Sequence, residues 1–288
     1  MQDDIAETDP YFQTRLDALK DIRECTCQLF SIADSIPKAR GSGVFVKVGD
    51  MHFLLSAAHV FESYDGQLYA PTTLGEKNYT PIGGQLNTNK INTSRQKDTT
   101  DLAILELHPD IISPLLSFYS FLDGKYLGLN HNLVNNLYYM YYGYPASKKQ
   151  TKLKLLENKI IAKPNYFPTI PIDPSMYAQF GCDIHRNIVI EYNKRRTFDI
   201  EKNVQETAPD TYGMSGSGLW FIPPQANIPN KSPVKYLVSI LTEWPTKNRK
   251  HILSTRIDIV TETLRQTYGF QFPISQIYQM NIDLEKLG

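Results

Sequence analysis

The chain has 288 residues, of which 41% are hydrophobic and 21% are charged, as is usual for a soluble globular protein. Its 30 Lys and Arg residues balance its 30 Asp and Glu residues, which argues against nucleic acid or a membrane surface as the main partner. No stretch approaches the roughly 18 apolar residues of a membrane-spanning helix, and the acidic N-terminus does not resemble a secretory signal. The three cysteines, Cys25, Cys27 and Cys182, are typical of a reducing compartment, so we expect a cytoplasmic protein. No Cys/His cluster has zinc-site spacing, and we expect no metal and no other cofactor.

The first predicted element is a helix over residues 11–22, where Phe12, Leu16 and Leu19 recur at helical spacing. Residues 43–48 then predict a strand, Gly49 and Asp50 a tight turn, and residues 51–56 the returning strand. A polar stretch over residues 71–100 follows, and residues 101–107 predict the next strand.

In the second half, residues 122–136 carry several Asn and Gly residues and are the expected linker between two halves of the chain. Asp258 is the expected N-cap of a closing helix that ends at Gly269, and the tail after it is left unassigned. Many short strands separated by turns favour an all-β sandwich or barrel. These further strands are predicted at residues 137–142, 187–192, 218–222, 236–242 and 251–255.

Three short segments carry residues whose chemistry fits together. Residues 54–60 are an apolar strand that runs into two alanines and His59, so that this imidazole can face an open cleft. Asp101 enters an apolar strand, where a partly buried carboxylate needs a donor such as an imidazole N–H. Glycines flank Ser215 and permit both a sharp turn and the close approach of a substrate carbonyl. A serine becomes a nucleophile when an imidazole takes its proton, and a buried carboxylate orients that imidazole.

In the chain order His, Asp, Ser, these segments resemble the signature blocks of the chymotrypsin/trypsin serine protease superfamily, and more particularly its intracellular bacterial-type members. The resemblance implies a serine endopeptidase with a chymotrypsin-like double β-barrel, to which this chain adds an N-terminal and a C-terminal helix. It assigns the general base to His59, the orienting acid to Asp101 and the nucleophile to Ser215. It assigns the oxyanion hole to the amides of Gly213 and Ser215. Residues 143–145 and 237–242 are weaker matches to the same family.

The resemblance covers roughly residues 36–260, and it sets the expected domain organisation. We expect a helical extension over residues 1–35, a first barrel over about 36–125 and a second over about 137–257. The C-terminal helix and tail are expected over residues 258–288.

Departures from the family pattern limit what the resemblance implies. Val60 replaces a cysteine that is frequent in secreted members, and Met214 replaces the aspartate that receives a newly cut N-terminus in digestive members. That form of zymogen activation is therefore not expected. The base of the specificity pocket is expected near Asp210, with Thr242 at its wall and Glu243 at its rim. An acidic pocket would favour Lys or Arg in the substrate; in the alternative, Asp210 only caps a turn.

Two residues compete locally with the proposed triad. Asp98 precedes a Thr-Thr loop and is more typical of a turn cap than of a catalytic acid. Ser217 also lies between glycines, but only Ser215 has one glycine two residues before it and another directly after it. The other five histidines have no ligand-like spacing and are expected to be structural or solvated: His52, His108, His131, His185 and His251.

The expected function is limited cytoplasmic proteolysis of a specific protein or peptide substrate, of the kind that the family supplies to bacterial stress responses and antiphage defence. Restraint is expected from residues 1–35 or from an activating or inhibiting protein partner. Two alternatives stay open. One is a catalytically silent scaffold that binds peptides in the cleft, and the other is an esterase that uses the same acyl-enzyme chemistry on a small ester.

Overall fold

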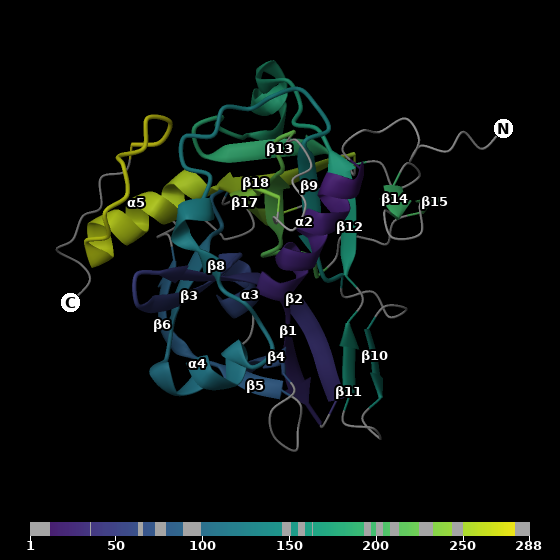
Figure 1. Cartoon of the computed structure of the whole chain (residues 1–288), viewed down its shortest axis with the longest axis vertical. Helices are drawn as coiled ribbons and strands as arrows, with labels where there is room; N and C mark the ends of the chain where they lie inside the picture. Colours follow the sequence, from purple (N-terminus) through teal and green to yellow (C-terminus); the bar gives the residue numbers. More distant parts are fainter. Residues whose placement is uncertain are drawn as a thin grey trace.

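Two curled and mainly antiparallel sheets, with few helices, make up the fold (Figure 1). The computed structural model describes residues 12–34, 36–62, 66–72, 79–88, 99–145, 151–154, 159–162, 164–192, 197–199, 204–207, 213–224, 233–243 and 250–279. The first sheet lies in the lower half of Figure 1 and the second in the upper half. This arrangement confirms the predicted all-β, chymotrypsin-like double barrel.

The first sheet has the strand order β5-β4-β1-β2-β3-β7-β6, and β8 pairs in parallel with β2. Its strands are β1 (Thr26–Ala33), β2 (Ile36–Val48), β3 (Met51–Ser56), β4 (Leu68–Pro71), β5 (Tyr79–Ile82), β6 (Gly84–Thr88), β7 (Ala103–Leu107) and β8 (Leu122–Asp123). The short helices α3 (Ala58–Glu62) and α4 (Pro109–Leu116) follow β3 and β7, and the 3-10 turn η2 (Gly124–Tyr126) follows β8.

The second sheet has the strand order β12-β9-β16-β17-β18-β13. Its strands are β9 (Tyr139–Gly143), β12 (Asn165–Thr169), β13 (Asn187–Glu191), β16 (Gly218–Phe221), β17 (Tyr236–Glu243) and β18 (His251–Arg256). Two separate hairpins are formed by β10 (Thr151–Lys154) with β11 (Lys159–Ala162) and by β14 (Thr197–Asp199) with β15 (Val204–Glu206). The 3-10 helix η4 (Pro174–Phe180) precedes β13.

Residues 122–127 contact both sheets. Leu122 pairs with Val46 in the first sheet, and Leu127 forms a bridge with Leu237 in the second. The predicted hairpin also forms, with Val44 opposite Leu55 and a left-handed Gly49 (φ +57°) in the turn.

The first sheet begins earlier in the chain than the predicted strands. β1 lies between β4 and β2, within the segment expected to be a helical extension. Its first six residues are all buried. Polar Thr26 and Gln28 alternate with apolar Cys27 and Leu29, but a register shift at Phe30 interrupts this short alternation.

The predicted N-terminal helix is α2 (Phe12–Cys25), and it packs across both sheets. Ala18 and Ile22 belong to the largest hydrophobic core cluster, together with Phe53 of the first sheet and Trp220 of the second. Polar contacts also hold α2 to the second half of the chain, because the side chain of Lys235 forms an ion pair with Asp21.

The closing helix, α5 (Ile257–Tyr268), ends at a left-handed Gly269 as predicted, but its N-cap is Arg256 and not Asp258. Asp258 is fully buried, and its Oδ1 accepts hydrogen bonds from the amide of Asn130 (3.0 Å) and the hydroxyl of Ser275 (2.8 Å). These partners are distant in sequence, so the local pattern could not distinguish this acceptor from a cap. Through Ser275, the segment after α5 is thus held to this buried carboxylate.

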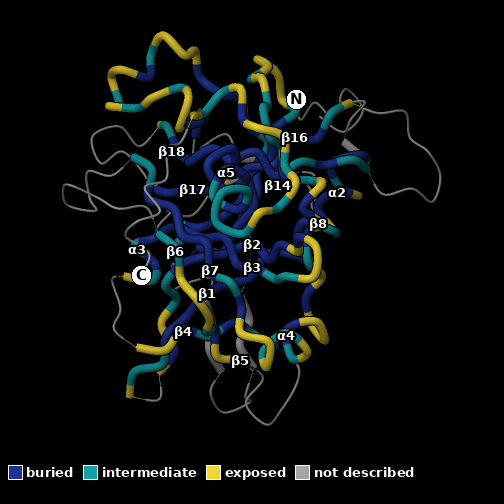
Figure 2. The backbone as a smooth tube through the Cα atoms, turned by 90° about the vertical axis from the view of Figure 1, so that its left-hand side faces the viewer, coloured by how far each residue is buried: buried dark blue, intermediate teal, exposed yellow. Residues whose placement is uncertain are grey.

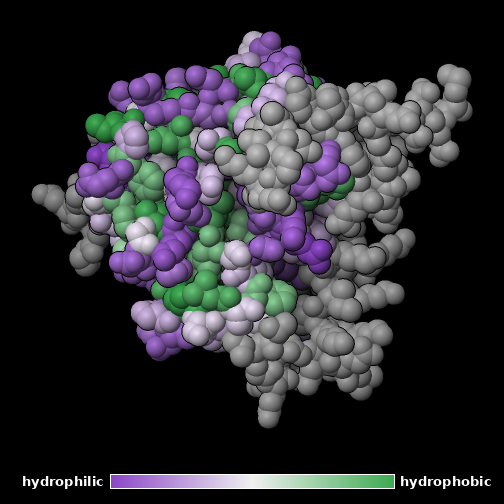
Figure 3. All heavy atoms as spheres, in the orientation of Figure 1, coloured by the Kyte–Doolittle hydropathy of each residue, from purple (hydrophilic) through white to green (hydrophobic). Residues whose placement is uncertain are grey.

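The central strands of both sheets are buried, as the dark blue parts of the tube show (Figure 2). In the view of Figure 3, the described surface is a mixture of hydrophilic and hydrophobic side chains. None of the three cysteines, all of which the structure describes, forms a disulfide, and Cys25 and Cys27 are buried. Within the described residues, no helix is both long and apolar enough to cross a bilayer.

Candidate active site

The pairing of β3 with β7 brings His59 and Asp101 together. Ser56, which ends β3, lies opposite Ala103, which begins β7. His59 follows β3 in the short helix α3, and Asp101 immediately precedes β7. The amide of Ala58 donates to the carbonyl of Asp101 (3.3 Å), so the two chain segments are also joined through the backbone.

The carboxylate of Asp101 holds both the backbone and the ring of His59. Its Oδ1 accepts the His59 amide at 2.9 Å, and its Oδ2 is hydrogen-bonded to His59 Nδ1. The Asp101 side chain is 4% exposed and the His59 side chain 37% exposed. With Nδ1 held by the carboxylate, Nε2 is the ring nitrogen left for proton transfer.

The second sheet holds the loop before Asp101 in place. Asn187 of β13 is fully buried, and its Nδ2 donates to the carbonyl of Thr99 at 2.5 Å. The hydroxyl of Thr255 points to the same carbonyl at 3.5 Å. Sequence reasoning missed Asn187 because its partner lies 88 residues away and no local motif marks the contact.

Ser215 lies in a turn whose backbone requires glycine at two positions. Gly213 has φ +83° and Gly216 has φ +87°, in the left-handed region that favours glycine. The turn is fastened by backbone hydrogen bonds from Gly216 N to Leu241 O (2.8 Å) and from Ser217 N to Met214 O (3.0 Å). The predicted role of these glycines in shaping the turn is thus confirmed.

Strand β2 places the serine turn beside α3. The amide of Ser42 donates to the carbonyl of Ser215 at 2.8 Å. A Cβ atom at Gly41 would lie 2.9 Å from that same carbonyl oxygen and 2.7 Å from Val60, the residue after His59. Ser215 and His59 make no hydrogen bond to each other in this structure, which describes both. Nucleophile–base hydrogen bonds are often long in ligand-free active sites.

Two amides of the serine turn remain available to an acceptor. Among the described residues, neither the Gly213 nor the Ser215 amide donates a hydrogen bond, whereas Gly216 and Ser217 both do. Two free amides on one turn are what an oxyanion hole needs.

The structure separates Ser215 from its local rival. Ser217 is fully buried, while Ser215 is partly exposed, so only Ser215 can present its hydroxyl at the surface. Met214, the residue before Ser215, is fully buried in a core cluster with Tyr141 and Phe167. Asp98, the rival of Asp101, lies outside the described residues.

The predicted specificity pocket is only partly described. Asp210 lies outside the described residues, and so does the side chain of Glu243 at the end of β17. Thr242 is fully buried, and its hydroxyl points to the carbonyl of Leu253 at 3.5 Å.

The other histidines lie apart from His59. The structure places them on structural contacts: His52 against Phe121, His108 at the N-cap of α4, His131 on the Tyr139 hydroxyl (2.7 Å), His185 on the Ile277 carbonyl (3.0 Å) and His251 against Phe180. In the described part of the chain, no three His, Cys, Asp or Glu residues form a group that could hold a metal ion.

Comparison with known proteins supports the fold and goes no further. No family model matches the sequence, and no curated protein matches it. Among solved structures, the chain is similar to the protease Anisep from Arthrobacter nicotinovorans, with a TM-score of 0.50. The similarity covers 85% of this chain and 96% of that one, at 14% sequence identity. The chain therefore shares with that protease a fold of two β-barrels.

Proposed function

We propose that the protein is a serine endopeptidase whose catalytic residues are His59, Asp101 and Ser215. The observation that carries the proposal is the convergence of three chain segments through β2 and β3. One segment supplies a carboxylate-bound imidazole, and the serine turn is hydrogen-bonded directly beside it. A serine beside an imidazole that a carboxylate orients is the set of side chains that acyl transfer requires.

In the proposed reaction, His59 Nε2 removes the proton from Ser215 Oγ as this oxygen attacks the carbonyl carbon of a peptide bond. The carbonyl oxygen becomes an oxyanion, which the amides of Gly213 and Ser215 stabilise; one such donor is typically worth about 3 kcal/mol. Protonated His59 then gives its proton to the leaving amine, and an acyl-enzyme forms on Ser215. Water hydrolyses the ester by the same steps, with His59 again as the base.

Asp101 acts by orienting the imidazole and stabilising its protonated form. Because Oδ1 also binds the His59 amide, the carboxylate fixes the position of the backbone as well as the ring. Its burial keeps water from competing for the same oxygen atoms.

The burial of Met214 supports activity without N-terminal processing. In this chain an apolar side chain among aromatic residues anchors the serine turn, so no buried charge there awaits a partner. We infer that the turn is assembled in the intact chain. The proposal also includes a cytoplasmic location and limited cleavage of a specific protein. It further includes a role in stress or antiphage defence and the recognition of Lys or Arg through Asp210.

The proposal is tested by digesting a peptide library with the wild-type protein and with Ser215→Ala, each confirmed as folded by circular dichroism. We expect new peptide termini with the wild type and none with the variant. Hydrolysis of p-nitrophenyl acetate without any peptide cleavage would support the esterase instead. Peptide binding without any hydrolysis would support a silent scaffold.

A further inference from the structure

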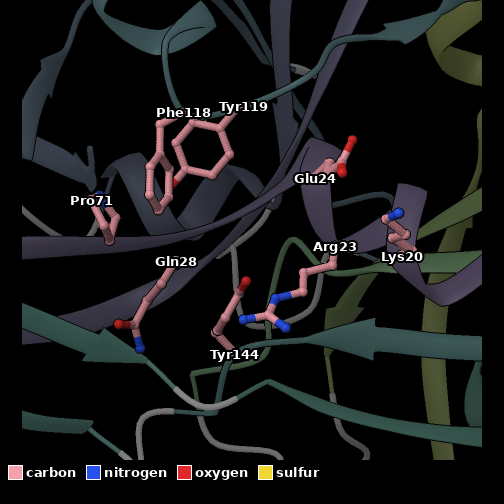
Figure 4. Close-up of a pocket in the computed structure, with 8 residues that line it drawn as sticks. All are labelled: Lys20, Arg23, Glu24, Gln28, Pro71, Phe118, Tyr119 and Tyr144. Atoms are coloured by element: carbon pink, nitrogen blue, oxygen red, sulfur yellow. The ribbon is translucent and has the colours of Figure 1, made fainter. Parts of the chain in front are cut away.

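A cavity of about 330 Å³ lies between α2, β1 and the segment that follows α4 (Figure 4). The residues that line it are Lys20, Arg23, Glu24, Gln28, Pro71, Phe118, Tyr119 and Tyr144. None of them belongs to the proposed catalytic triad or to its specificity pocket. Ligand pockets typically have volumes of about 300–1,000 Å³, so the cavity is large enough for a small ligand.

The charged rim of this cavity favours an anion. Lys20 and Arg23 lie one turn apart on α2, and in Figure 4 the guanidinium of Arg23 extends toward Tyr144. Neither cation forms an ion pair with any other described residue. The carboxylate of Glu24 is engaged by the hydroxyl of Ser120 at 3.2 Å.

The opposite wall is aromatic and partly open. Phe118 is 46% exposed, although large apolar side chains are usually buried, and its ring packs edge-on against Tyr119 at 4.9 Å. Pro71 lies beside them (Figure 4). A ligand that satisfies both walls carries an anionic group for Lys20 and Arg23 and an apolar or aromatic group for Phe118.

Contacts with Ser42 connect this cavity to the serine turn. Gln28, which lines the cavity, lies opposite Ser42 in the β1–β2 register. The amide of Tyr144, also in the lining, donates to Ser42 Oγ at 2.9 Å. On its other side, the Ser42 amide binds the carbonyl of Ser215. The Ser42 carbonyl accepts the Ser56 hydroxyl at 2.7 Å, which also ties Ser42 to β3.

We propose that this cavity is a regulatory site for a small anion joined to an aromatic or apolar group, and that ligand binding changes the serine turn through Ser42. A carboxylate at the end of a peptide and a phosphate on a small molecule share this chemistry. The binding part of the proposal is independent of the proposed function, whereas the coupling part rests on it.

Binding is tested by calorimetry with three probes: N-acetylphenylalanine for a peptide end, phenyl phosphate for a small-molecule phosphate, and N-acetylphenylalanine amide as the uncharged control. We expect at least one anion to bind and the amide to bind about tenfold more weakly or worse, as loss of a charged hydrogen bond implies. The tighter anion identifies the source of the ligand. Equal binding of the amide, or no binding of either anion at millimolar concentration, would overturn the proposal.

Matched variants locate the binding site. Arg23→Gln is expected to weaken the anion about tenfold, while Lys38→Gln, which removes an exposed charge outside the cavity, should leave affinity within about twofold. In the second pair, Phe118→Ala should weaken binding of the anion. Its control, Leu116→Ala, shortens an exposed apolar side chain outside the lining and should leave the affinity unchanged. Equal effects within either pair would place the ligand elsewhere and overturn the assignment.

Coupling is tested with and without catalysis. The anion should change hydrogen exchange over residues 213–218, and it should change the rate at which a fluorophosphonate labels Ser215 by about fivefold or more. Ser42→Ala should still bind the anion but lose both responses. If the wild type binds the anion and is never labelled, the proposed function fails and the site stands. If the wild type is labelled but the anion changes neither hydrogen exchange nor the labelling rate, only the coupling part of the proposal is wrong.

Discussion

Alanine at Gly216 should disrupt the serine turn far more than alanine at Gly269 disrupts the end of α5. Both glycines have left-handed backbones, with φ +87° and +71°, so each substitution pays a conformational cost of roughly 1–2 kcal/mol. The surroundings differ. A Cβ at Gly269 would meet nothing within 4 Å, whereas one at Gly216 would lie 2.0 Å from the Ser42 carbonyl and 2.2 Å from the Ser56 hydroxyl.

Neither neighbour of Gly216 can move without loss, because the Ser56 hydroxyl donates to the Ser42 carbonyl. Relief of the clash would also break the backbone bonds from Gly216 to Leu241 and from Ser42 to Ser215, each worth about 1 kcal/mol net. We therefore expect Gly216→Ala to lose about 3–4 kcal/mol of unfolding free energy, which is about 2 kcal/mol more than Gly269→Ala loses.

Urea denaturation followed by circular dichroism measures both unfolding free energies, and fluorophosphonate labelling reports the state of the turn. Gly269→Ala should be labelled at the wild-type rate, whereas Gly216→Ala should be labelled slowly or not at all even where it remains folded. Equal stabilities for the two variants, or normal labelling of Gly216→Ala, would refute the packing described around the turn.

Three further predictions concern the acid Asp101, its support Asn187 and the half-buried His131. Asp101→Asn should leave the fold intact and lower the rate of peptide hydrolysis roughly 10⁴-fold, measured by steady-state kinetics, because the imidazole loses its orienting charge. Asn187→Ala should lower the unfolding free energy by about 1–3 kcal/mol in urea and also slow labelling, because the Thr99 carbonyl loses the shorter of its two hydrogen bonds; labelling at the wild-type rate would argue against a positioning role. Burial and then the charge of Arg256 lower the pKa of His131 to about 4, so the unfolded chain binds the proton more readily between pH 6.5 and pH 4. The unfolding free energy should therefore decrease as the pH is lowered through this window, by about 2 kcal/mol from pH 7 to pH 5. His131→Gln should reduce that decrease. If urea titrations show the same pH dependence for the variant and the wild type, His131 is not the group responsible.

The parts of the fold that could be predicted are those with local patterns. The hairpin of β2 and β3 has a Gly-Asp turn between two apolar strands, and its register matches the expectation. In contrast, β1 was not predicted, because a register shift between Leu29 and Phe30 interrupts its short alternation of polar and apolar residues. The predicted N-cap of α5 was wrong because Asp258 instead accepts hydrogen bonds from residues distant in sequence, among them Ser275.

The residues of the candidate site also fall into those with a local sequence motif and those without one. The residues that carry chemistry lie in short motifs, and the structure brings His59, Asp101 and the Ser215 turn to one place. The residues that hold them there, Ser42 and Asn187, act through single hydrogen bonds across the fold. Such contacts depend on the pairing of strands far apart in sequence, and a single sequence gives no signal for them.

Covalent labelling tests the central claim most directly. The folded wild-type protein is reacted with a fluorophosphonate, beside Ser215→Ala, His59→Ala and the matched control Ser217→Ala, and the adduct is located by mass spectrometry. The account predicts a single adduct on Ser215 that is retained in Ser217→Ala and lost in the other two variants. An adduct on another residue, or labelling that persists in His59→Ala, would contradict it.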